Sequence, residues 1–147
     1  MANVQDVARC FLYLDAQQED GDGISNLKLQ KLVYYAQGFH LAIYDDPLFE
    51  AEIEAWTHGP VVPELYRTYR EHGRNPIPYE LGEFDPLADF NEAQREHIEE
   101  VYEVFGQYSA WTLRNMTHEE TPWLDHERNA DVIPFDEMKD YFKKRIE

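Results

Sequence analysis

Histidines are the side chains of this sequence best suited to proton transfer or metal binding, and six of them are spread along the chain. They are His40, His58, His72, His97, His118 and His126. A zinc site requires closely spaced histidine, cysteine or carboxylate ligands, and the chain has neither an HExxH motif nor a cysteine pair. The densest group of candidate ligands comprises His118, Glu119, Glu120, Asp125 and His126. Because adjacent positions do not share one helical face, no metal site is predicted here.

The alternative to a metal ligand is a structural role for His118. We expect it to end a helix, where it hydrogen-bonds backbone groups or lies near Trp123. A hydrolase that uses His118 and the neighbouring carboxylates stays open as an alternative. Metal analysis of the purified protein would test it.

Calcium binding is suggested by the acidic run at residues 20–23, DGDG. An EF-hand loop needs carboxylates at its first, third and fifth positions and a glutamate at its twelfth. Aligning Gly23 with the loop glycine places Gln18 first and Leu29 twelfth, and neither supplies the required ligand. The run is therefore expected to be a solvated turn.

Nucleophilic catalysis would have to use Cys10, the single cysteine of the chain. A reactive thiol must be accessible and lie beside a base, whereas the apolar helical pattern around Cys10 indicates a buried, inert thiol. One cysteine also excludes a disulfide framework. The chain has no glycine-rich phosphate-binding loop either. No catalytic residue, metal or cofactor is predicted, and we expect the protein not to be an enzyme.

A long helix near the N-terminus must position most of the other polar and aromatic candidates. Its main apolar face, at i, i+3, i+4 and i+7 spacing, comprises Leu29, Leu32, Val33, Ala36, His40 and Ile43. Leu27, Tyr34 and Leu41 lie off this face, which is typical of a central helix. Its first turns carry Lys28, Gln30 and Lys31. These side chains are expected to lay their stems on apolar surface and expose their polar heads, which makes them candidates for a functional surface.

The remaining pattern predicts a mainly α fold, a single compact helical domain with a short β-strand or hairpin after the central helix. Helices are predicted at residues 4–14, 63–72, 91–105, 109–116 and 135–146, with a helical turn at 121–124. Residues 51–56 alternate as a half-buried strand, and Gly59 and Pro60 are expected to turn the chain. A loop at residues 75–90 is expected to be packed by Ile77, Tyr79, Phe84 and Leu87.

The composition indicates one acidic domain that covers residues 1–147. With 147 residues, 43% of them hydrophobic, the chain can bury a core of its own. Its 30 acidic and 13 basic residues give a net charge of −17, which opposes binding to nucleic acid and to anionic membranes. Partners should therefore be basic or apolar. No leader sequence and no apolar run of about 18 residues is present, so a cytoplasmic protein is expected.

Acidic residues are concentrated in one stretch that has Arg95 as its single basic residue. They are Glu80, Glu83, Asp85, Asp89, Glu92, Glu96, Glu99, Glu100 and Glu103. A charged outer helix face is usually solvated surface, and a docking surface for a basic partner is the alternative. A protein with this much negative charge could also mimic nucleic acid and block a DNA-binding enzyme. Competition with DNA that weakens steeply with salt would support that mimicry.

Three ordered motifs resemble the Panacea domain, a family of small bacterial and phage antitoxins that includes SocA-like and GepA-like proteins. Residues 27–38, LKLQKLVYYAQG, match the family's long helix, and residues 47–49, PLF, match the turn after it. Residues 53–62, IEAWTHGPVV, match its glycine–proline segment. Residues 113–123, LRNMTHEETPW, are similar to the close of the domain. The resemblance spans residues 4–123, and the acidic middle is the least matched part.

The resemblance implies an antitoxin of a bacterial or prophage toxin–antitoxin system, which neutralises a toxin encoded nearby by direct protein–protein binding. It also implies an alternative role as an adaptor that delivers the toxin to a protease. The candidate toxin-binding residues are Lys28, Gln30, Lys31, Tyr34, Tyr35, Trp56, His58 and Tyr66. Aromatic residues beside long cationic side chains are common interface anchors, although a buried framework would leave the same motif. No contact with nucleic acid or membrane is predicted.

The acidic middle departs from the family pattern. It leaves open whether a toxin docks through the family-like helix or through the acidic face. Loss of neutralisation on charge reversal at Lys31, with folding intact, would favour the helix.

Overall fold

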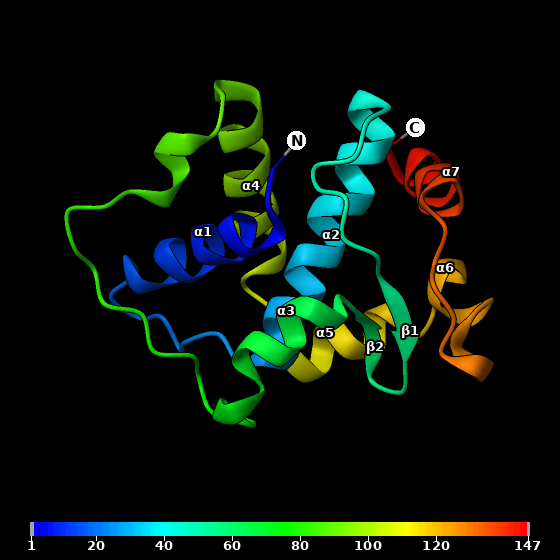
Figure 1. The fold of residues 1–147 in the computed structure, drawn as a ribbon, viewed down its shortest axis with the longest axis horizontal. Helices are drawn as coiled ribbons and strands as arrows, with labels where there is room; N and C mark the ends of the chain where they lie inside the picture. Colours follow the sequence, from blue (N-terminus) through cyan, green and yellow to red (C-terminus); the bar gives the residue numbers. More distant parts are fainter. Residues whose placement is uncertain (1, 147) are drawn as a thin grey trace.

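Helix α2 (Asn26–Tyr44) runs through the middle of the molecule, and the other elements pack around it (Figure 1). The computed structural model describes residues 2–146. The other helices are α1 (Val4–Ala16), α3 (Pro63–Tyr69), α4 (Glu92–Phe105), α5 (Ala110–Thr117), α6 (Thr121–Leu124) and α7 (Phe135–Ile146). The strands are β1 (Glu54–Trp56) and β2 (Gly59–Val61), and short 3-10 helices are η1 (Arg70–His72), η2 (Pro86–Asp89) and η3 (Glu127–Asn129). The predicted mainly α fold with a short β element is confirmed.

Capping residues start the helices where the sequence predicts them. Asn3 at α1 and Ser109 at α5 each accept a hydrogen bond from a backbone N–H of the first turn. Asn91 and Gln94 form a reciprocal capping box at α4. These side chains satisfy N–H groups that have no partner within the helix. Helix α3 begins instead with Pro63, whose missing N–H costs nothing at that position.

The hairpin differs from the prediction in the place of its turn. Strands β1 and β2 pair antiparallel with Trp56 opposite Gly59, so residues 57–58 form the turn. The expectation that Gly59 and Pro60 turn the chain is wrong, because both lie in β2. Proline has no backbone N–H to donate. Pro60 is tolerated in β2 because this strand lies at the edge of a two-stranded sheet, where no further strand requires that N–H. Residues 131–133 cover β1 from its other side.

Aromatic rings from α2, α4 and α7 meet in the core. The Tyr35 ring stacks on Phe105 with a centroid distance of 4.2 Å, and the Phe39 ring packs against Phe142 at 4.7 Å. Gly38 allows this approach, because a Cβ atom there would lie 2.2 Å from the Phe142 ring. The contact explains a glycine in the middle of a helix, where it costs about 1 kcal/mol relative to alanine.

Two of the predicted core positions are wrong. Ile43 is 51% exposed, because it lies in the last turn of α2, where Tyr44 is also exposed. Phe84 is 59% exposed. The loop that contains Phe84 reaches the core through Ile77 and Leu87 on either side of it, and the ring between them faces solvent.

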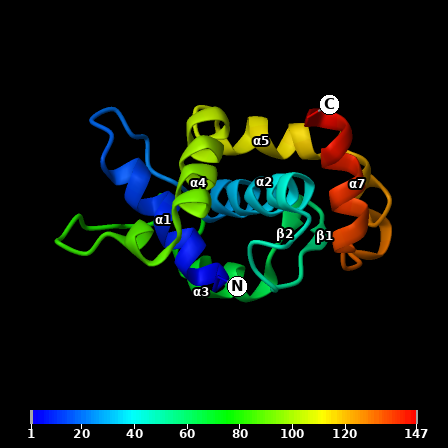
Figure 2. The same ribbon diagram turned by 90° about the horizontal axis from the view of Figure 1, so that it is seen from above.

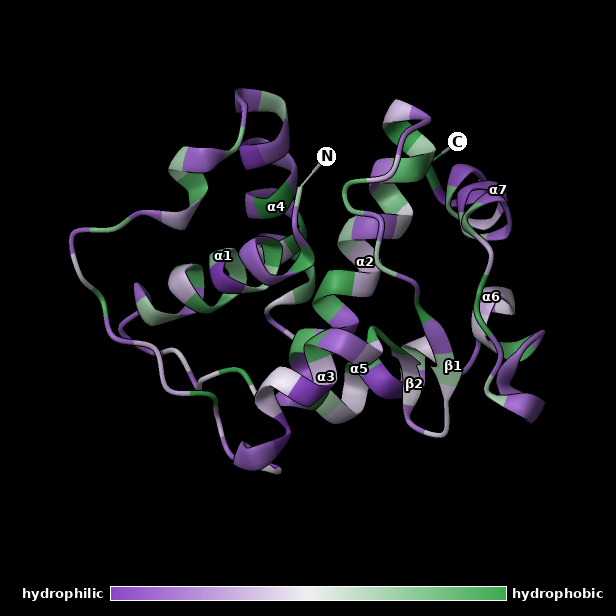
Figure 3. Cartoon of the chain, in the orientation of Figure 1, coloured by the Kyte–Doolittle hydropathy of each residue, from purple (hydrophilic) through white to green (hydrophobic). Residues whose placement is uncertain are grey.

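The helices form layers on both sides of α2. Figure 2 shows α5 on one side of α2 and α3 on the opposite side, and α7 packs directly against α2. Figure 3 shows alternating hydrophilic and hydrophobic residues along α4 and α7, as expected of helices with one buried face. Across residues 2–146, no helix combines the length and apolar character that a membrane crossing needs.

Candidate functional site

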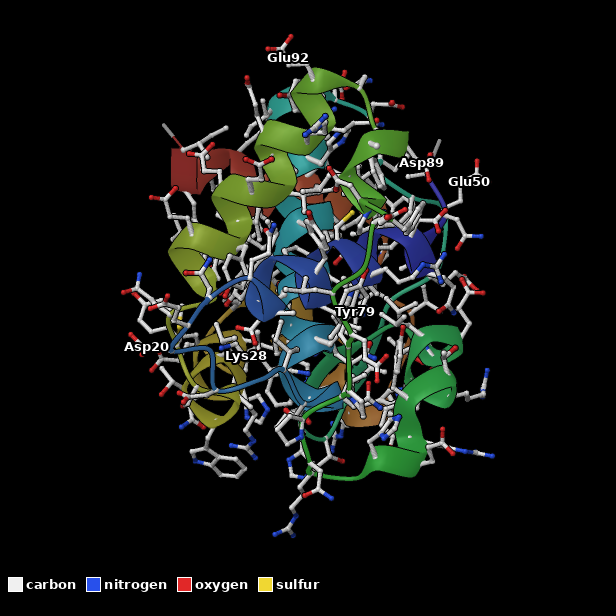
Figure 4. The ribbon with its side chains drawn as sticks, turned by 90° about the vertical axis from the view of Figure 1, so that its left-hand side faces the viewer. Asp20, Lys28, Glu50, Tyr79, Asp89 and Glu92 are labelled. Atoms are coloured by element: carbon white, nitrogen blue, oxygen red, sulfur yellow. The ribbon has the colours of Figure 1, made fainter. Side chains whose placement is uncertain are left out.

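The polar residues at the start of α2 are buried, which corrects the expectation that their heads lie in solvent. Lys31 is 0% exposed, Gln30 is 1% exposed and Lys28 is 9% exposed. Their heads find backbone partners inside the protein, since Lys28 Nζ donates to the Gly106 carbonyl at 2.6 Å and Lys31 Nζ to the Pro60 carbonyl at 2.9 Å. Figure 4 shows Lys28 between α2 and the chain that follows α4. Carbonyl oxygens from distant segments accept hydrogen bonds from the two lysine ammonium groups, which makes the burial of these groups possible.

Two glutamines of α2 bind the backbone of the segments that follow it. Gln30 Oε1 accepts from the Val62 N–H at 2.9 Å. Gln37 Oε1 accepts from the Leu48 N–H at 2.8 Å, and its Nε2 donates to the Phe49 carbonyl at 2.6 Å. These bonds explain why the helix motif occurs together with the PLF and GPVV segments, because α2 side chains hold the backbone of both.

The Glu120 carboxylate is the buried acceptor of two tyrosines of α2. It is 3% exposed and accepts from the Tyr34 hydroxyl at 3.0 Å, the Tyr35 hydroxyl at 2.7 Å and Arg145 Nη1 at 3.0 Å. Burial raises the pKa of Glu120, and the three donors oppose that rise. Helix α6 begins at Thr121, and Glu120 is its N-cap residue. We call Lys28, Gln30, Lys31, Tyr34, Tyr35 and Glu120 the polar frame.

Gly59 of β2 lies directly against Lys31 of the polar frame. Its φ of +108° disfavours any side chain, and a Cβ atom would lie 2.5 Å from Lys31 Cε and 2.7 Å from Thr117 Oγ1. The position thus requires glycine for both its backbone conformation and its close contacts.

The three remaining predicted contact residues, Trp56, His58 and Tyr66, line one groove of about 940 Å³ beside the hairpin. Gln30 of the polar frame also lines this groove, although it is almost fully buried. The Trp56 and Tyr66 rings meet edge to face with centroids 5.2 Å apart. Trp111 of α5 lines the same groove and is 56% exposed. Trp111 lies outside the motifs from which the candidate residues came, although its place two residues before the buried Leu113 puts it on the outer face of a short helix.

Two arginines also line the groove, Arg70 of η1 and Arg74 just after it. Sequence reasoning missed both, because nothing in the sequence distinguishes them from other surface arginines. Aspartate and glutamate are absent from the groove lining of the described chain, even though the protein has 30 acidic residues. We call the surface formed by Trp56, His58, Tyr66, Arg70, Arg74 and Trp111 the aromatic groove.

Further cationic groups lie next to the groove wall. The Arg114 guanidinium lies 4.3 Å from the Trp111 ring centroid, and its Nε donates to His58 Nδ1 at 3.3 Å. Burial, followed by the charge of Arg114, lowers the pKa of Lys31 to about 7. Burial, then Arg114 and Lys31, also lower the pKa of His118. Basic side chains are therefore close together in this part of an otherwise acidic protein.

His118 has the structural surroundings that the sequence predicts. It follows the last residue of α5, and its ring stacks on Trp123 with centroids 3.9 Å apart. Within the described chain, no group of three or more histidine, cysteine, aspartate or glutamate side chains is arranged to hold a metal ion. Cys10 is buried, and burial raises the pKa of its thiol to about 12. The thiolate that nucleophilic attack requires is therefore disfavoured.

The outer face of α4 forms a second charged surface. Its exposed acidic residues are Glu92, Glu96, Glu99, Glu100 and Glu103. None of these carboxylates pairs with a basic side chain among residues 2–146. Figure 4 shows Glu92, with Asp89 and Glu50, at the periphery of the molecule.

Comparison with known proteins gives one family and one curated relative to consider. Residues 29–124 match the family model described as antitoxin SocA-like, Panacea domain. Antitoxin SocA of Caulobacter vibrioides (strain NA1000 / CB15N) is 35% identical over 109 residues, which are 68% of this chain and 58% of that protein. The aligned part thus spans less than two thirds of the relative. No solved structure matches the chain.

Proposed function

The chain belongs to the antitoxin SocA-like, Panacea-domain family, and from this membership we propose that it is an antitoxin that binds its toxin at the aromatic groove. The observation that carries the proposal is the convergence of Trp56, His58 and Tyr66 with Trp111 on one open groove. In this role the protein neutralises a cognate toxin protein, encoded by a neighbouring gene, by direct binding and without catalysis.

The exposed aromatic side chains are the physical basis of this binding. Trp111 is 56% exposed and Tyr66 is 36% exposed, although tryptophan and tyrosine gain free energy when they leave water. Tryptophan, tyrosine and arginine are also the residues that most often dominate the binding energy of protein interfaces. A partner that covers the groove would bury both kinds of side chain at once.

The polar frame acts indirectly in this proposal. Lys31 and Gln30 hold Pro60 of the hairpin and Val62 before α3 in place. Lys28 holds the Gly106 carbonyl after α4, and Tyr34 and Tyr35 hold Glu120. The toxin contacts the surface that this frame supports. Substitutions in the frame then reduce neutralisation by disturbing the fold. Of the predicted contact residues, only Trp56, His58 and Tyr66 are proposed to touch the toxin.

Co-expression with the product of the adjacent gene tests the proposal. The wild-type chain should restore growth and co-purify with that product. A Trp56→Ala/Tyr66→Ala variant should lose both effects. The matched control is Leu81→Ala/Phe84→Ala, which removes two exposed apolar side chains from a different surface and should behave as the wild type.

Other outcomes of this experiment separate the alternatives. Rescue of growth without a stable complex would favour delivery of the toxin to a protease over direct neutralisation. Failure of the wild-type chain to rescue growth would reject the antitoxin role. If both double variants rescue growth and co-purify, the toxin binds elsewhere.

The acidic face of α4 supports a second candidate function. Its unpaired carboxylates, within the described residues, could dock a basic partner or imitate a nucleic-acid backbone. A Glu96→Lys/Glu99→Lys/Glu103→Lys variant should then lose neutralisation, or should stop competing with DNA for a DNA-binding enzyme. Retained neutralisation by this variant would favour the groove.

A further inference from the structure

We infer that the aromatic groove binds an acidic segment of the partner protein, with carboxylates at its arginines and His58 and a large apolar side chain against its tryptophans. This inference rests on the proposed direct binding of a toxin and adds the chemistry of the toxin segment. The segment is local, so the partner as a whole can be basic and can also be attracted by the acidic remainder of this protein.

The groove is complementary to negative charge. Arg70 and Arg74 line it, and no aspartate or glutamate of the described residues does. Neither arginine forms an ion pair within residues 2–146. Glu54 approaches the groove only by accepting a hydrogen bond from the Trp56 indole and does not belong to the lining. The two guanidinium groups can therefore bind a carboxylate from outside in the paired geometry that arginine favours.

The tautomer of His58 gives the groove an N–H donor in addition to the arginines. Its Nδ1 must accept the hydrogen bond from Arg114 Nε, because a guanidinium has donors but no acceptor. The neutral ring then carries its proton on Nε2, and this N–H has no partner among the described residues. His58 thus offers a neutral N–H donor to the groove, which suits a carboxylate or carbonyl oxygen.

The groups beside the groove reinforce this preference. Lys31 and Arg114 lie near each other, and no carboxylate contributes to the lowered pKa of Lys31. A carboxylate that enters the groove would reduce the mutual repulsion of these cations. The apolar part of the lining, which includes Leu27, Val61 and the two tryptophans, is suited to a large apolar side chain next to that carboxylate.

A single nucleic-acid strand is the competing polyanion, since aromatic rings and arginines also bind bases and phosphates. The net charge of −17 argues against it. A nucleic-acid strand carries one negative charge on every phosphate, and this acidic protein repels the phosphates that lie outside the groove, whereas a protein segment can carry its negative charges only where the groove needs them.

Phenylacetate is the probe for this chemistry, and phenylacetamide is its uncharged control. Titration is followed through the indole N–H resonances of the three tryptophans. Phenylacetate should shift the Trp56 and Trp111 signals and leave that of Trp123, which is buried and bonded to the Trp56 carbonyl, nearly unchanged. The acid should bind about tenfold more tightly than the amide, as expected for charge-assisted hydrogen bonds.

Charge reversal identifies the groups responsible. Arg70→Glu/Arg74→Glu should abolish the preference for the acid over the amide. Arg67→Glu is the matched control, because Arg67 is exposed on the preceding helix α3 but does not line the groove, and this variant should retain the preference. Equal binding of acid and amide by the wild type, or tighter binding of an oligothymidylate than of the acid, would overturn the inference.

The same variants separate this inference from the proposed function. In co-expression with the adjacent gene product, Arg70→Glu/Arg74→Glu should lose neutralisation, and Arg67→Glu should keep it. If Arg70→Glu/Arg74→Glu neutralises as well as the wild type, an acidic toxin segment is rejected while the antitoxin role stands. If the wild type fails to neutralise, the antitoxin role is rejected, and selective phenylacetate binding would still support the groove chemistry.

Discussion

The polar frame and the aromatic groove meet at the hairpin, yet their side chains exist in opposite physical conditions. Lys31 bonds to Pro60 from the interior and is 0% exposed, whereas His58, two residues earlier in the chain than Pro60, lines an open groove. Frame residues have their hydrogen-bonding partners within the protein. Groove residues leave aromatic surface and N–H donors available to another molecule.

The residues of the family motifs thus fall into two sets, one buried and hydrogen-bonded within the protein and one that lines the groove. A buried polar group that loses its partner costs about 1–3 kcal/mol, so the frame is sensitive to substitution through folding. An exposed side chain contributes little to folding and can contribute much to binding. Stability and toxin affinity must therefore be measured together for each variant.

Glu120→Ala should produce the largest effect, on stability. It leaves the buried Tyr34 and Tyr35 hydroxyls without their acceptor and the Arg145 guanidinium without its partner. The free energy of unfolding in urea should fall by about 3 kcal/mol. The control is Glu119→Ala, which removes the exposed neighbouring carboxylate and should change the free energy of unfolding by less than about 0.5 kcal/mol. Equal losses from the two variants would show that Glu120 is not a buried anchor.

Trp111→Ala should show the opposite behaviour. Toxin affinity should weaken by about 2 kcal/mol, or roughly thirtyfold, as expected for an interface anchor. The free energy of unfolding should fall by no more than about 1 kcal/mol, through loss of the Arg114 contact. Isothermal titration with the toxin and urea unfolding measure the two quantities. Phe84→Ala, which truncates a ring of similar exposure elsewhere, should leave affinity unchanged.

Gly38→Ala should lower the free energy of unfolding by about 1 kcal/mol. The new Cβ atom would overlap the Phe142 ring, and the better helix propensity of alanine would offset part of that strain. Adding Phe142→Leu should make the effect of Gly38→Ala smaller or reverse its sign. A double-mutant cycle of unfolding free energies would reveal this coupling, and strict additivity would contradict the contact.

Lys31 should give a different kind of effect, a slope in the dependence of stability on pH. Its pKa is lowered from 10.5 to about 7 in the folded chain, so above pH 7 the unfolded chain holds more protons. The free energy of unfolding should therefore rise as pH increases from about 7 to about 9.5. Burial lowers the pKa of Lys28 as well, which acts in the same direction.

Lys31→Met provides the comparison for this slope. The variant should show a smaller rise than the wild type over the same pH range, because one of the two lysines no longer titrates. Identical slopes, measured by urea unfolding at several pH values, would mean that Lys31 is solvated in the folded protein.

Local sequence signals predicted the elements of the fold well. Asn3, Ser109 and the Asn91–Gln94 pair mark helix starts through bonds to their own first turns, and such short-range chemistry is readable from the sequence. The burial of Lys31 was not readable, because its partner is the Pro60 carbonyl, 29 residues away. Adjacent polar residues on a helix normally indicate solvent exposure, and here they indicate distant backbone partners.

The candidate site was predicted only in part for the same reason. Trp56 and His58 belong to a motif that the sequence displays, Tyr66 follows it by four residues, and all three line the groove. Arg70, Arg74 and Trp111 reach that groove from two places along the chain outside the family motifs. Their convergence depends on how α3, η1 and α5 pack around α2, which no local pattern encodes.

Hydrogen exchange of the protein with and without its proposed toxin tests the division between frame and groove most directly. The expected result is new protection of backbone amides at residues 56–59, 66–74 and 110–114 in the complex, with α4 unchanged. The buried amides of α2 should be slow to exchange in both states, because the frame is already formed. Protection confined to α4, with the groove unchanged, would contradict binding at the groove and assign the toxin to the acidic face.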